Sequence, residues 1–162
     1  MINKTFIHNI VTELLGCTVI WGKQNCPKPR KPFATLRLYA FRGVGMNDEI
    51  PTATLGQVEV KGTQEATLEV QYFGTDAEQK LIELNQALSR PTIVDRCFGA
   101  GVAFFDAQNV QDLTALLDAT NYEERASIDL SVRFMLSVID EPGYINTVTI
   151  TAEDGDFTIT GG

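Results

Sequence analysis

The chain has 162 residues, enough for one domain with a hydrophobic core. With 44% hydrophobic and 21% charged residues, its composition is that of an ordinary globular protein and argues against disorder, collagen and a membrane protein. The apolar runs fall short of the roughly 20 residues of a membrane helix, and the N-terminus lacks the pattern of a signal peptide. We therefore expect a protein made and kept in a cytoplasm.

The net charge is -8, and the sequence pI is near 4.6. Binding to nucleic acid through bulk electrostatics is therefore not expected, because phosphate contacts need a basic surface. The three cysteines, Cys17, Cys26 and Cys97, are odd in number and form no CxxC pair. This favours reduced thiols over a disulfide framework.

Apolar residues at helical spacing predict an amphipathic helix over 3–15, and Gly16 is a plausible stop. A short apolar strand is expected over 17–22. The loop at 23–32 follows, and it is the one locally basic stretch of the chain. Three prolines favour a stiff, extended course for it: Pro27, Pro29 and Pro32.

Alternation and β-forming residues predict a strand over 33–42, followed by a flexible loop tip at 43–49. Two further strands are expected over 52–60 and 65–73. The sequence Lys61-Gly62-Thr63 provides a hairpin turn signal between them. The alternating polar and apolar residues of the second strand predict that one of its faces is exposed to solvent.

A second helix is predicted over 75–90. Thr75 can cap its start, and Glu78, three residues later, completes a capping-box pattern. Pro91 is expected to end the helix. Two short apolar stretches follow within 93–105.

Periodicity does not decide whether residues 110–117 form a strand or a helical turn. The strongest strand signal begins at Asn121, with regular alternation from 124 to 139, and is longer than the usual five or six residues. A turn at 141–143 leads to a strand over 144–151, and Asp154-Gly155-Asp156 turns into a last strand over 157–160. Together these elements predict a single α+β domain with a mostly antiparallel sheet and two main helices.

Signals for catalysis are sparse. The single histidine, His8, lies within the first helix, which argues against a histidine-based triad. We expect it at the surface or at an edge. Glu123 and Glu124 are adjacent and would point to opposite faces of a strand, so they would not share a site. The sequence therefore predicts a protein that is not an enzyme.

A metal or nucleotide site is also not expected. Asp106, Asp112 and Asp118 are regularly spaced but do not fit the calcium-loop pattern, so a polar loop face is the preferred interpretation. Neither GxxxxGK[ST] nor GxGxxG occurs in the sequence. We predict neither a metal nor a cofactor.

One polar constellation stands out. Arg125, Asp129 and Arg133 fall on one face of the long strand, and adjacent members lie roughly 13 Å apart at about 3.3 Å per residue. They cannot all pair with one another, so their partners lie on neighbouring strands or on another subunit. The alternatives are a solvated sheet face and an intersubunit or lumen-facing surface.

Residues 20–36, IWGKQNCPKPRKPFATL, resemble the entry segment of a family of phage neck terminator proteins, although Cys26 stands where a small residue is expected. Residues 65–74, EATLEVQYFG, resemble its central strand. QDLTALLD at 111–118 followed by YEERASIDL at 122–130 is similar to its next segment, and GYINTV at 143–148 resembles its final strand.

The resemblance implies a tail-terminator-like α+β domain over residues 1–162 that forms a homo-oligomeric ring, usually sixfold, on the tail tube. Such a ring ends tail polymerisation and joins the tail to the head connector. Expected partners are the tail tube protein, possibly the tail sheath, and connector proteins, while genomic DNA passes through without specific binding. The protein would be part of the virion, assembled in the bacterial cytoplasm without contact to a membrane.

The expected subunit or neck interface combines the Pro-rich loop with the polar constellation on the long strand. Its residues are Gln24, Asn25, Pro27, Pro29, Pro32, Arg125, Asp129 and Arg133. Two other functions stay open: another head–tail connector or neck protein, and a soluble binding module without enzymatic activity.

Overall fold

The structure is a computed structural model that describes residues 1–23, 27–116, 122–152 and 155–160. The chain divides into two compact units, and three long strands contribute residues to both. The larger unit consists of Met1–Met46 and Gly62–Leu136, and the smaller unit of Asn47–Lys61 and Ser137–Gly162.

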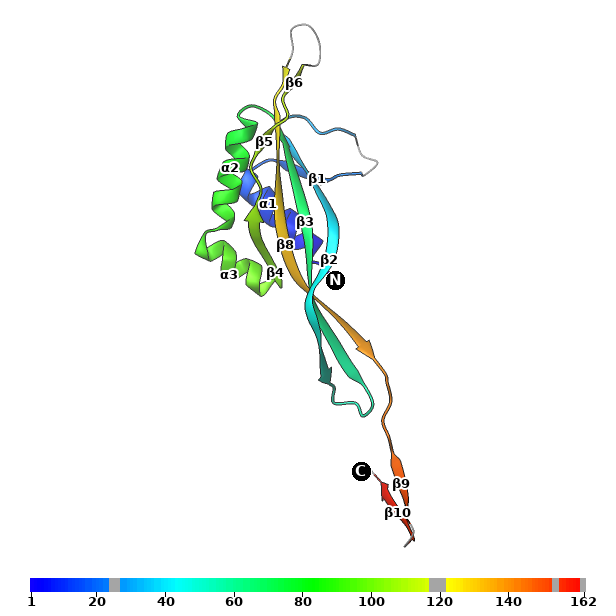
Figure 1. Cartoon of the computed structure of the whole chain (residues 1–162). Helices are drawn as coiled ribbons and strands as arrows, with labels where there is room; N and C mark the ends of the chain where they lie inside the picture. The colour runs from blue at the N-terminus through cyan, green and yellow to red at the C-terminus, as the bar shows by residue number, and fades with distance from the viewer. Residues whose placement is uncertain (24–26, 117–121, 153–154, 161–162) are drawn as a thin grey trace. The chain divides into compact units, whose positions relative to one another are not determined.

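The predicted α+β class is confirmed, since the described residues form helices and a mostly antiparallel set of strands (Figure 1). In chain order the elements are α1 (Lys4–Leu15), β1 (Thr18–Trp21), β2 (Phe33–Pro51), β3 (Val58–Phe73), α2 (Ala77–Leu88), α3 (Pro91–Gly99), β4 (Val102–Ala107), β5 (Gln111–Asp112), β6 (Ala115–Leu116), β7 (Tyr122–Glu123), β8 (Arg125–Asp140), β9 (Thr147–Ala152) and β10 (Gly155–Thr160).

The first helix matches its prediction. The Asn3 side chain accepts a hydrogen bond from the Phe6 backbone N–H at 3.0 Å, which satisfies one of the free donors at the start of α1. Gly16 ends the helix with φ 62, in the left-handed conformation that glycine adopts without strain. The buried stripe of α1 faces the core and consists of Ile7, Ile10, Val11 and Leu15.

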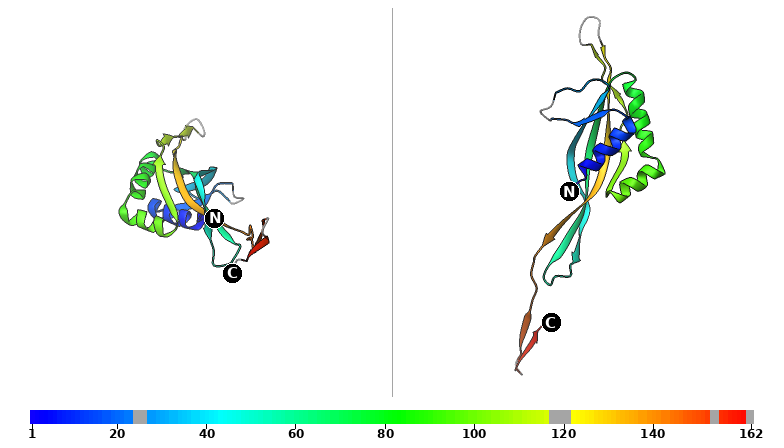
Figure 2. Two further views of the ribbon diagram at one scale, coloured as in Figure 1. Left: turned by 60° about the horizontal axis from the view of Figure 1, so that its bottom comes forward. Right: turned by 180° about the vertical axis from the view of Figure 1, so that it is seen from behind.

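The main sheet has the strand order β1-β2-β3-β8-β4, and β5 also pairs with β8. Helices α1, α2 and α3 lie on one face of it (Figures 1 and 2). Leu36, Leu68 and Ile128 from three adjacent strands are almost fully buried in the core that these helices cover. The larger unit is thus a two-layer arrangement in which each layer buries one apolar face.

Two of the predicted breaks between strands are wrong. Residues 43–49 are not a loop tip, because β2 continues to Pro51, and β3 runs through Gly62 without the turn expected at 61–63. Pairing between the two strands keeps both extended, and glycine does not break a strand that has a partner. The connection lies at 52–57, where the Thr52 N–H donates to the Gln57 carbonyl at 3.1 Å.

The helical region also differs from expectation. The helix predicted over 75–90 ends at Leu88, and Pro91 begins a further helix, α3, because the first helical position needs no backbone N–H. The capping box of Thr75 and Glu78 is wrong as well, since Asp76 is the N-cap and its side chain makes no capping hydrogen bond.

The long strand predicted over 124–139 is confirmed as β8. Residues 110–117, left undecided, contain two short strands, β5 and β6. Residues 141–146 have no regular structure, and the strand predicted over 144–151 is found as β9 from Thr147.

The last predicted strand, 157–160, is found in β10, which begins earlier, at Gly155. Gly155 and Asp156 therefore belong to a strand and not to the expected turn, because they pair with Ala152 and Thr151 of β9. Asp154, the first residue of that turn, lies outside the described residues.

Cys17 and Cys97 are free thiols whose pKa is raised by burial, and Cys26 lies outside the described residues. None of the described helices is long and apolar enough to span a membrane.

Candidate interaction surface

The sheet face opposite the helices carries polar side chains from β2, β3 and β8. On β3 this face is formed by residues such as Glu65, Glu69 and Gln71, which alternate with the core residues. Glu69 accepts a hydrogen bond from the Gln71 side-chain amide at 2.7 Å and lies 3.8 Å from the Arg37 guanidinium. The alternation predicted for this strand is confirmed.

Glu65 is held between two arginines. Its Oε2 lies 3.1 Å from Arg133 of β8, and its Oε1 accepts a hydrogen bond from Arg42 of β2. These hydrogen bonds, from Arg42 first and then Arg133, lower the pKa of the Glu65 carboxyl. The Arg133 guanidinium also stacks 4.3 Å from the ring centroid of Phe105. Arg133 is therefore fixed by groups of its own chain.

Asp129 has its partner on β2. Its Oδ2 accepts a hydrogen bond from the Tyr39 hydroxyl at 2.8 Å, and this bond is the first cause of the raised pKa of Tyr39. The next residue, Ala40, has φ 53, which interrupts the alternation of β2. Phe41 can then pack edge-on against Phe134 on the helix-covered side, with ring centroids 6.4 Å apart.

Arg125 donates from Nε to the Leu113 carbonyl at 2.8 Å. Each of the three residues in the predicted constellation thus contacts a different partner, and Arg125, Asp129 and Arg133 do not pair with one another. Their described partners belong to the same chain. A role for these residues between subunits stays a prediction.

The Pro-rich loop approaches the sheet at β7. Lys28 and Lys31 lie 3.0 and 2.7 Å from Oε1 of Glu123, whose side chain is only 8% exposed. Pro29 is half-buried, whereas Pro27 and Pro32 are exposed. Gln24 and Asn25 lie outside the described residues. We call Lys28, Lys31 and Glu123 the loop clamp.

The two lysines of the loop clamp strongly shift the pKa of its acid. The hydrogen bonds from Lys31 and then Lys28 lower the pKa of Glu123 to about 2. Lys28 also lies 5.9 and 5.7 Å from the ring centroids of Phe33 and Phe73, which stack on each other at 4.6 Å. No pattern in the sequence relates Glu123 to Lys28 and Lys31, which lie more than 90 positions away. The loop clamp could therefore not be predicted.

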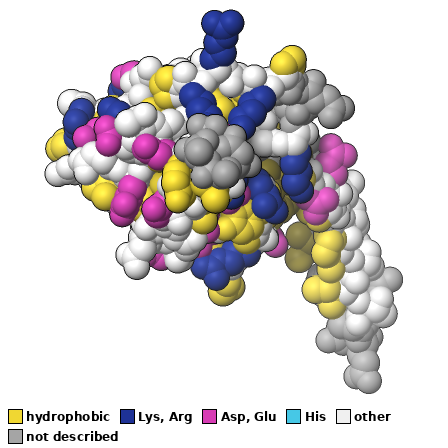
Figure 3. Space-filling view, turned by 90° about the horizontal axis from the view of Figure 1, so that it is seen from above, with side chains coloured by type: hydrophobic (Ala, Val, Ile, Leu, Met, Phe, Trp, Pro, Cys, Tyr) yellow, Lys and Arg dark blue, Asp and Glu magenta, His cyan; other side chains and the backbone are white. Residues whose placement is uncertain are grey.

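A close approach between Gly74 and Pro32 also holds the Pro-rich loop in place. Gly74, with φ 150, donates from its N–H to the Glu124 carbonyl at 3.1 Å. A Cβ atom at Gly74 would lie 3.0 Å from the Pro32 Cβ. Glycine is therefore required where Pro32 meets the end of β3. Several Lys and Arg side chains gather on this end of the larger unit (Figure 3).

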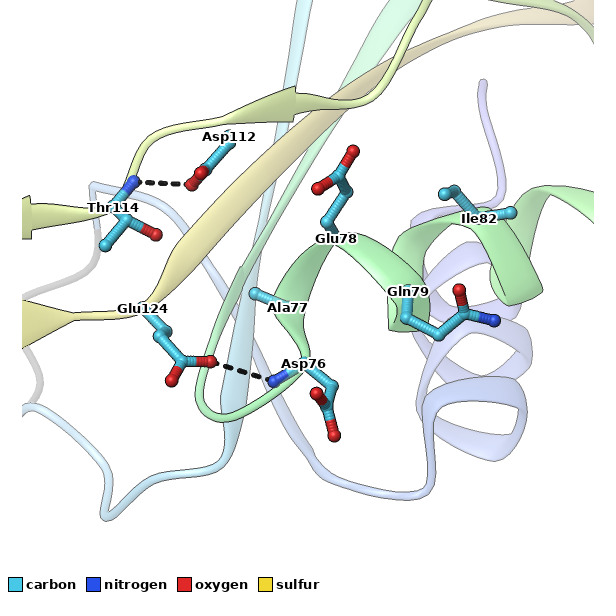
Figure 4. Close-up of a pocket in the computed structure, with 8 residues that line it drawn as sticks. All are labelled: Asp76, Ala77, Glu78, Gln79, Ile82, Asp112, Thr114 and Glu124. Atoms are coloured by element: carbon cyan, nitrogen blue, oxygen red, sulfur yellow. Dashed lines mark hydrogen bonds between the residues drawn. The ribbon is translucent and has the colours of Figure 1, made fainter.

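An acidic hollow of about 560 Å³ lies at the start of α2 (Figure 4). Glu124 reaches it from the segment before β8 and accepts a hydrogen bond from the Asp76 N–H at 2.9 Å, in place of the expected capping box. Asp112 accepts from the Thr114 N–H at 2.8 Å, and the hydrogen bonds from Thr114 lower its pKa. Glu123 and Glu124 contact different partners, as expected.

Among the residues expected to carry no chemistry, His8 has a structural contact. His8 is half-buried, and its Nε2 lies 2.9 Å from the Val19 carbonyl of β1. Asp106 is exposed at φ 45, where β4 has a bulge, and Asp118 lies outside the described residues. The described part of the chain contains no group of three or more metal-ligating side chains.

The smaller unit exposes many large apolar side chains. Ile145 is 78% exposed and Leu55 is 67% exposed. The β9–β10 hairpin places Val148 opposite Ile159, and both are exposed. Among the residues whose side chains are described, the exposed set consists of Ile50, Leu55, Val138, Ile139, Tyr144, Ile145, Val148, Ile150 and Ile159. A surface of this kind marks a contact with another molecule.

Charge is divided unequally between the two units. The smaller unit contains eight of the 21 acidic residues and only one of the 13 basic residues, Lys61. Its formal charge is therefore -7, and the larger unit carries the remaining -1. The acidity of the chain is thus a property of the smaller unit, which favours contact with a basic surface.

The model of a family described as phage neck terminator protein matches residues 4–161, nearly the whole chain. No curated protein matches it. The match includes the sheet, the three helices, the loop clamp and the apolar residues of the smaller unit.

Proposed function

Because the chain belongs to the phage neck terminator protein family and is thus a structural protein of a phage virion, we propose that it assembles as a ring of six copies on the end of the tail tube. The ring ends polymerisation of the tube and provides the surface to which the head connector binds. The tube protein and the connector proteins, and in sheathed tails the sheath protein, are its partners.

One observation carries this proposal beyond the family: the exposed apolar side chains of the smaller unit. Exposing nine large apolar side chains to water is unfavourable, and a single chain gains nothing from it. Burial against another protein removes this cost. The proposal therefore assigns the smaller unit to protein–protein contacts, and the chain acts through its surfaces and not by catalysis.

A closed ring of identical copies needs two different, complementary patches on each subunit. The smaller unit supplies one. We propose that the Pro-rich loop with the open face of the sheet, including Gln24, Asn25, Pro27, Arg125 and Asp129, contacts a neighbouring copy or the next ring of the neck. The loop clamp favours this assignment, because a loop that is already held in place loses less entropy on docking.

The acidity of the chain has a role in the same proposal. Six copies multiply the negative charge around a channel, so DNA passes through without adhering. We propose that assembly takes place in the cytoplasm of the bacterial host and needs no membrane.

Reconstruction of the neck in intact virions by cryo-electron microscopy tests the proposal. We expect six copies of the chain in one ring, between the last ring of tube protein and the connector. A ring of this chain that is separated from the tube by another protein would make it a connector instead. Its absence from the neck would contradict the proposed function.

A further inference from the structure

The outer edge of β2 is open over most of its length. β1 runs parallel to β2 but pairs with it only from Thr18↔Phe33 to Trp21↔Leu36. Beyond Leu36, β2 continues to Pro51 with β3 on its other side, and no strand in the described part of the chain lies on the outer side. Unpaired backbone groups on such an edge can accept a strand from another molecule.

A groove of about 350 Å³ lies where β1 ends. Trp21, Leu38 and Phe41 give it an apolar lining, and Phe41 is 56% exposed. The charged side chains that line it are basic and include no acidic group: Lys4, Lys23 and Arg37. The groove is therefore suited to a strand that is both apolar and acidic.

Among the residues that the structure describes, the positive charge of the groove is only partly neutralised. Arg37 lies 3.8 Å from Glu69, and Lys4 stacks 5.8 Å from the ring centroid of Trp21. Lys23 is exposed. The larger unit thus offers apolar and cationic contacts at the same edge.

The smaller unit has the complementary properties. Residues 137–162 contain five acidic residues and no basic residue. In β9 and β10, threonines alternate with exposed apolar residues such as Val148, Ile150 and Ile159. β9 and β10 pair only with each other among the described strands, and an isolated two-stranded hairpin is at best marginally stable in water. An additional strand partner would stabilise the hairpin.

We propose that the β9–β10 hairpin of one copy adds to the outer edge of β2 in a second copy, beside the groove formed by Trp21, Leu38 and Phe41. The apolar side chains of the hairpin enter the groove, and its acidic residues lie near Lys4 and Lys23. Donor and acceptor are different parts of the same chain, so the contact is head-to-tail and repeats from copy to copy until a ring closes. This inference rests on the proposed ring.

Photocrosslinking in virions tests the contact. Phe41 is replaced by benzoylphenylalanine in the full chain, and the crosslinked peptides are identified by mass spectrometry. The matched control places the same group at Phe98 of α3, which is 87% exposed and lies outside the groove. We expect the Phe41 probe to give a covalent dimer linked to residues 140–160 of a second copy, with no such link from Phe98.

Crosslinks from Phe41 to another virion protein, or no crosslink to residues 140–160 while the chain is present in the neck, would overturn the strand contact and leave the proposed function intact. Absence of the chain from the neck would overturn both. The two failures are therefore distinguishable in the same preparation.

Charge reversal provides a second test that does not depend on the probe geometry. Lys23→Glu should lower the yield of the Phe41 dimer about fivefold, since it replaces an attraction with a repulsion. Adding Asp156→Lys, in β10 of the hairpin that docks beside the groove, should restore most of that yield. Arg90→Glu, at an exposed position outside the groove, is the control and should leave the yield unchanged. An equal loss in the control would contradict the proposed contact.

Discussion

Replacing the acid of the loop clamp, Glu123→Gln, should release the Pro-rich loop without unfolding the chain. The change keeps the shape of the side chain but removes the charge that Lys28 and Lys31 contact at 3.0 and 2.7 Å. The lysine side chains are 60% and 40% exposed, so water can solvate them once the carboxylate is gone. Screening at such exposed groups limits each contact to roughly 1 kcal/mol, and we expect a total loss of about 1–2 kcal/mol.

Urea unfolding at several pH values measures this loss and its cause. Hydrogen bonds to the lysines hold the pKa of Glu123 at about 2, below its value in an unfolded chain. A lowered pKa gives stability that is fully present above the unfolded value and is lost as the pH falls toward 2. The stability difference between the wild type and Glu123→Gln should therefore be constant above about pH 5 and shrink below about pH 4.5.

The control for this experiment is Glu49→Gln, an exposed glutamate of β2 for which the structure shows no ion pair among the described residues. It should change the free energy of unfolding by less than about 0.5 kcal/mol at every pH. If Glu123→Gln lowers the free energy of unfolding no more than this control does, the ion pairs of the loop clamp are refuted. A loss that stays constant down to about pH 2.5 would refute them as well.

Three other substitutions test separate parts of the fold by chemical unfolding. Leu68→Ala opens a cavity at a fully buried position and should cost about 2–5 kcal/mol, whereas a cost below about 1 kcal/mol would contradict the assigned core. Tyr39→Phe removes the hydrogen bond to Asp129 and should cost about 1 kcal/mol; an Asp129→Ala background that leaves this cost unchanged would argue against the bond. Gly74→Ala should cost about 1–3 kcal/mol because of its φ of 150 and its approach to Pro32, and an unchanged stability would mean that the loop lies elsewhere.

The sequence could predict elements whose signals are local. The stripe of α1 and the alternation in β8 each follow from residues within one element, and both were predicted with nearly correct bounds. Glycines were misleading where a partner strand decides the structure, because pairing with β3 keeps β2 extended beyond Gly43. Pro91 was misleading because proline can begin a helix as well as follow one.

The contacts of the candidate surface are harder to predict from the sequence. The spacing of Arg125, Asp129 and Arg133 correctly indicated that they need partners elsewhere, but their partners depend on the strand order. The sequence indicates no partner for Glu123, because its contacts with Lys28 and Lys31 join residues distant in the chain. The division of charge between the two units could be recognised only once their boundaries were known.

Tail length tests the central claim most directly. The gene for this chain is inactivated in the phage that carries it, and tails in the lysate are measured by electron microscopy, with the intact gene supplied in trans as the control. A terminator predicts tails that are overlong or variable in length and not joined to full heads, with normal virions restored by the control. Tails of normal length beside separate heads would instead indicate a connector, and normal joined virions would contradict a role in the neck.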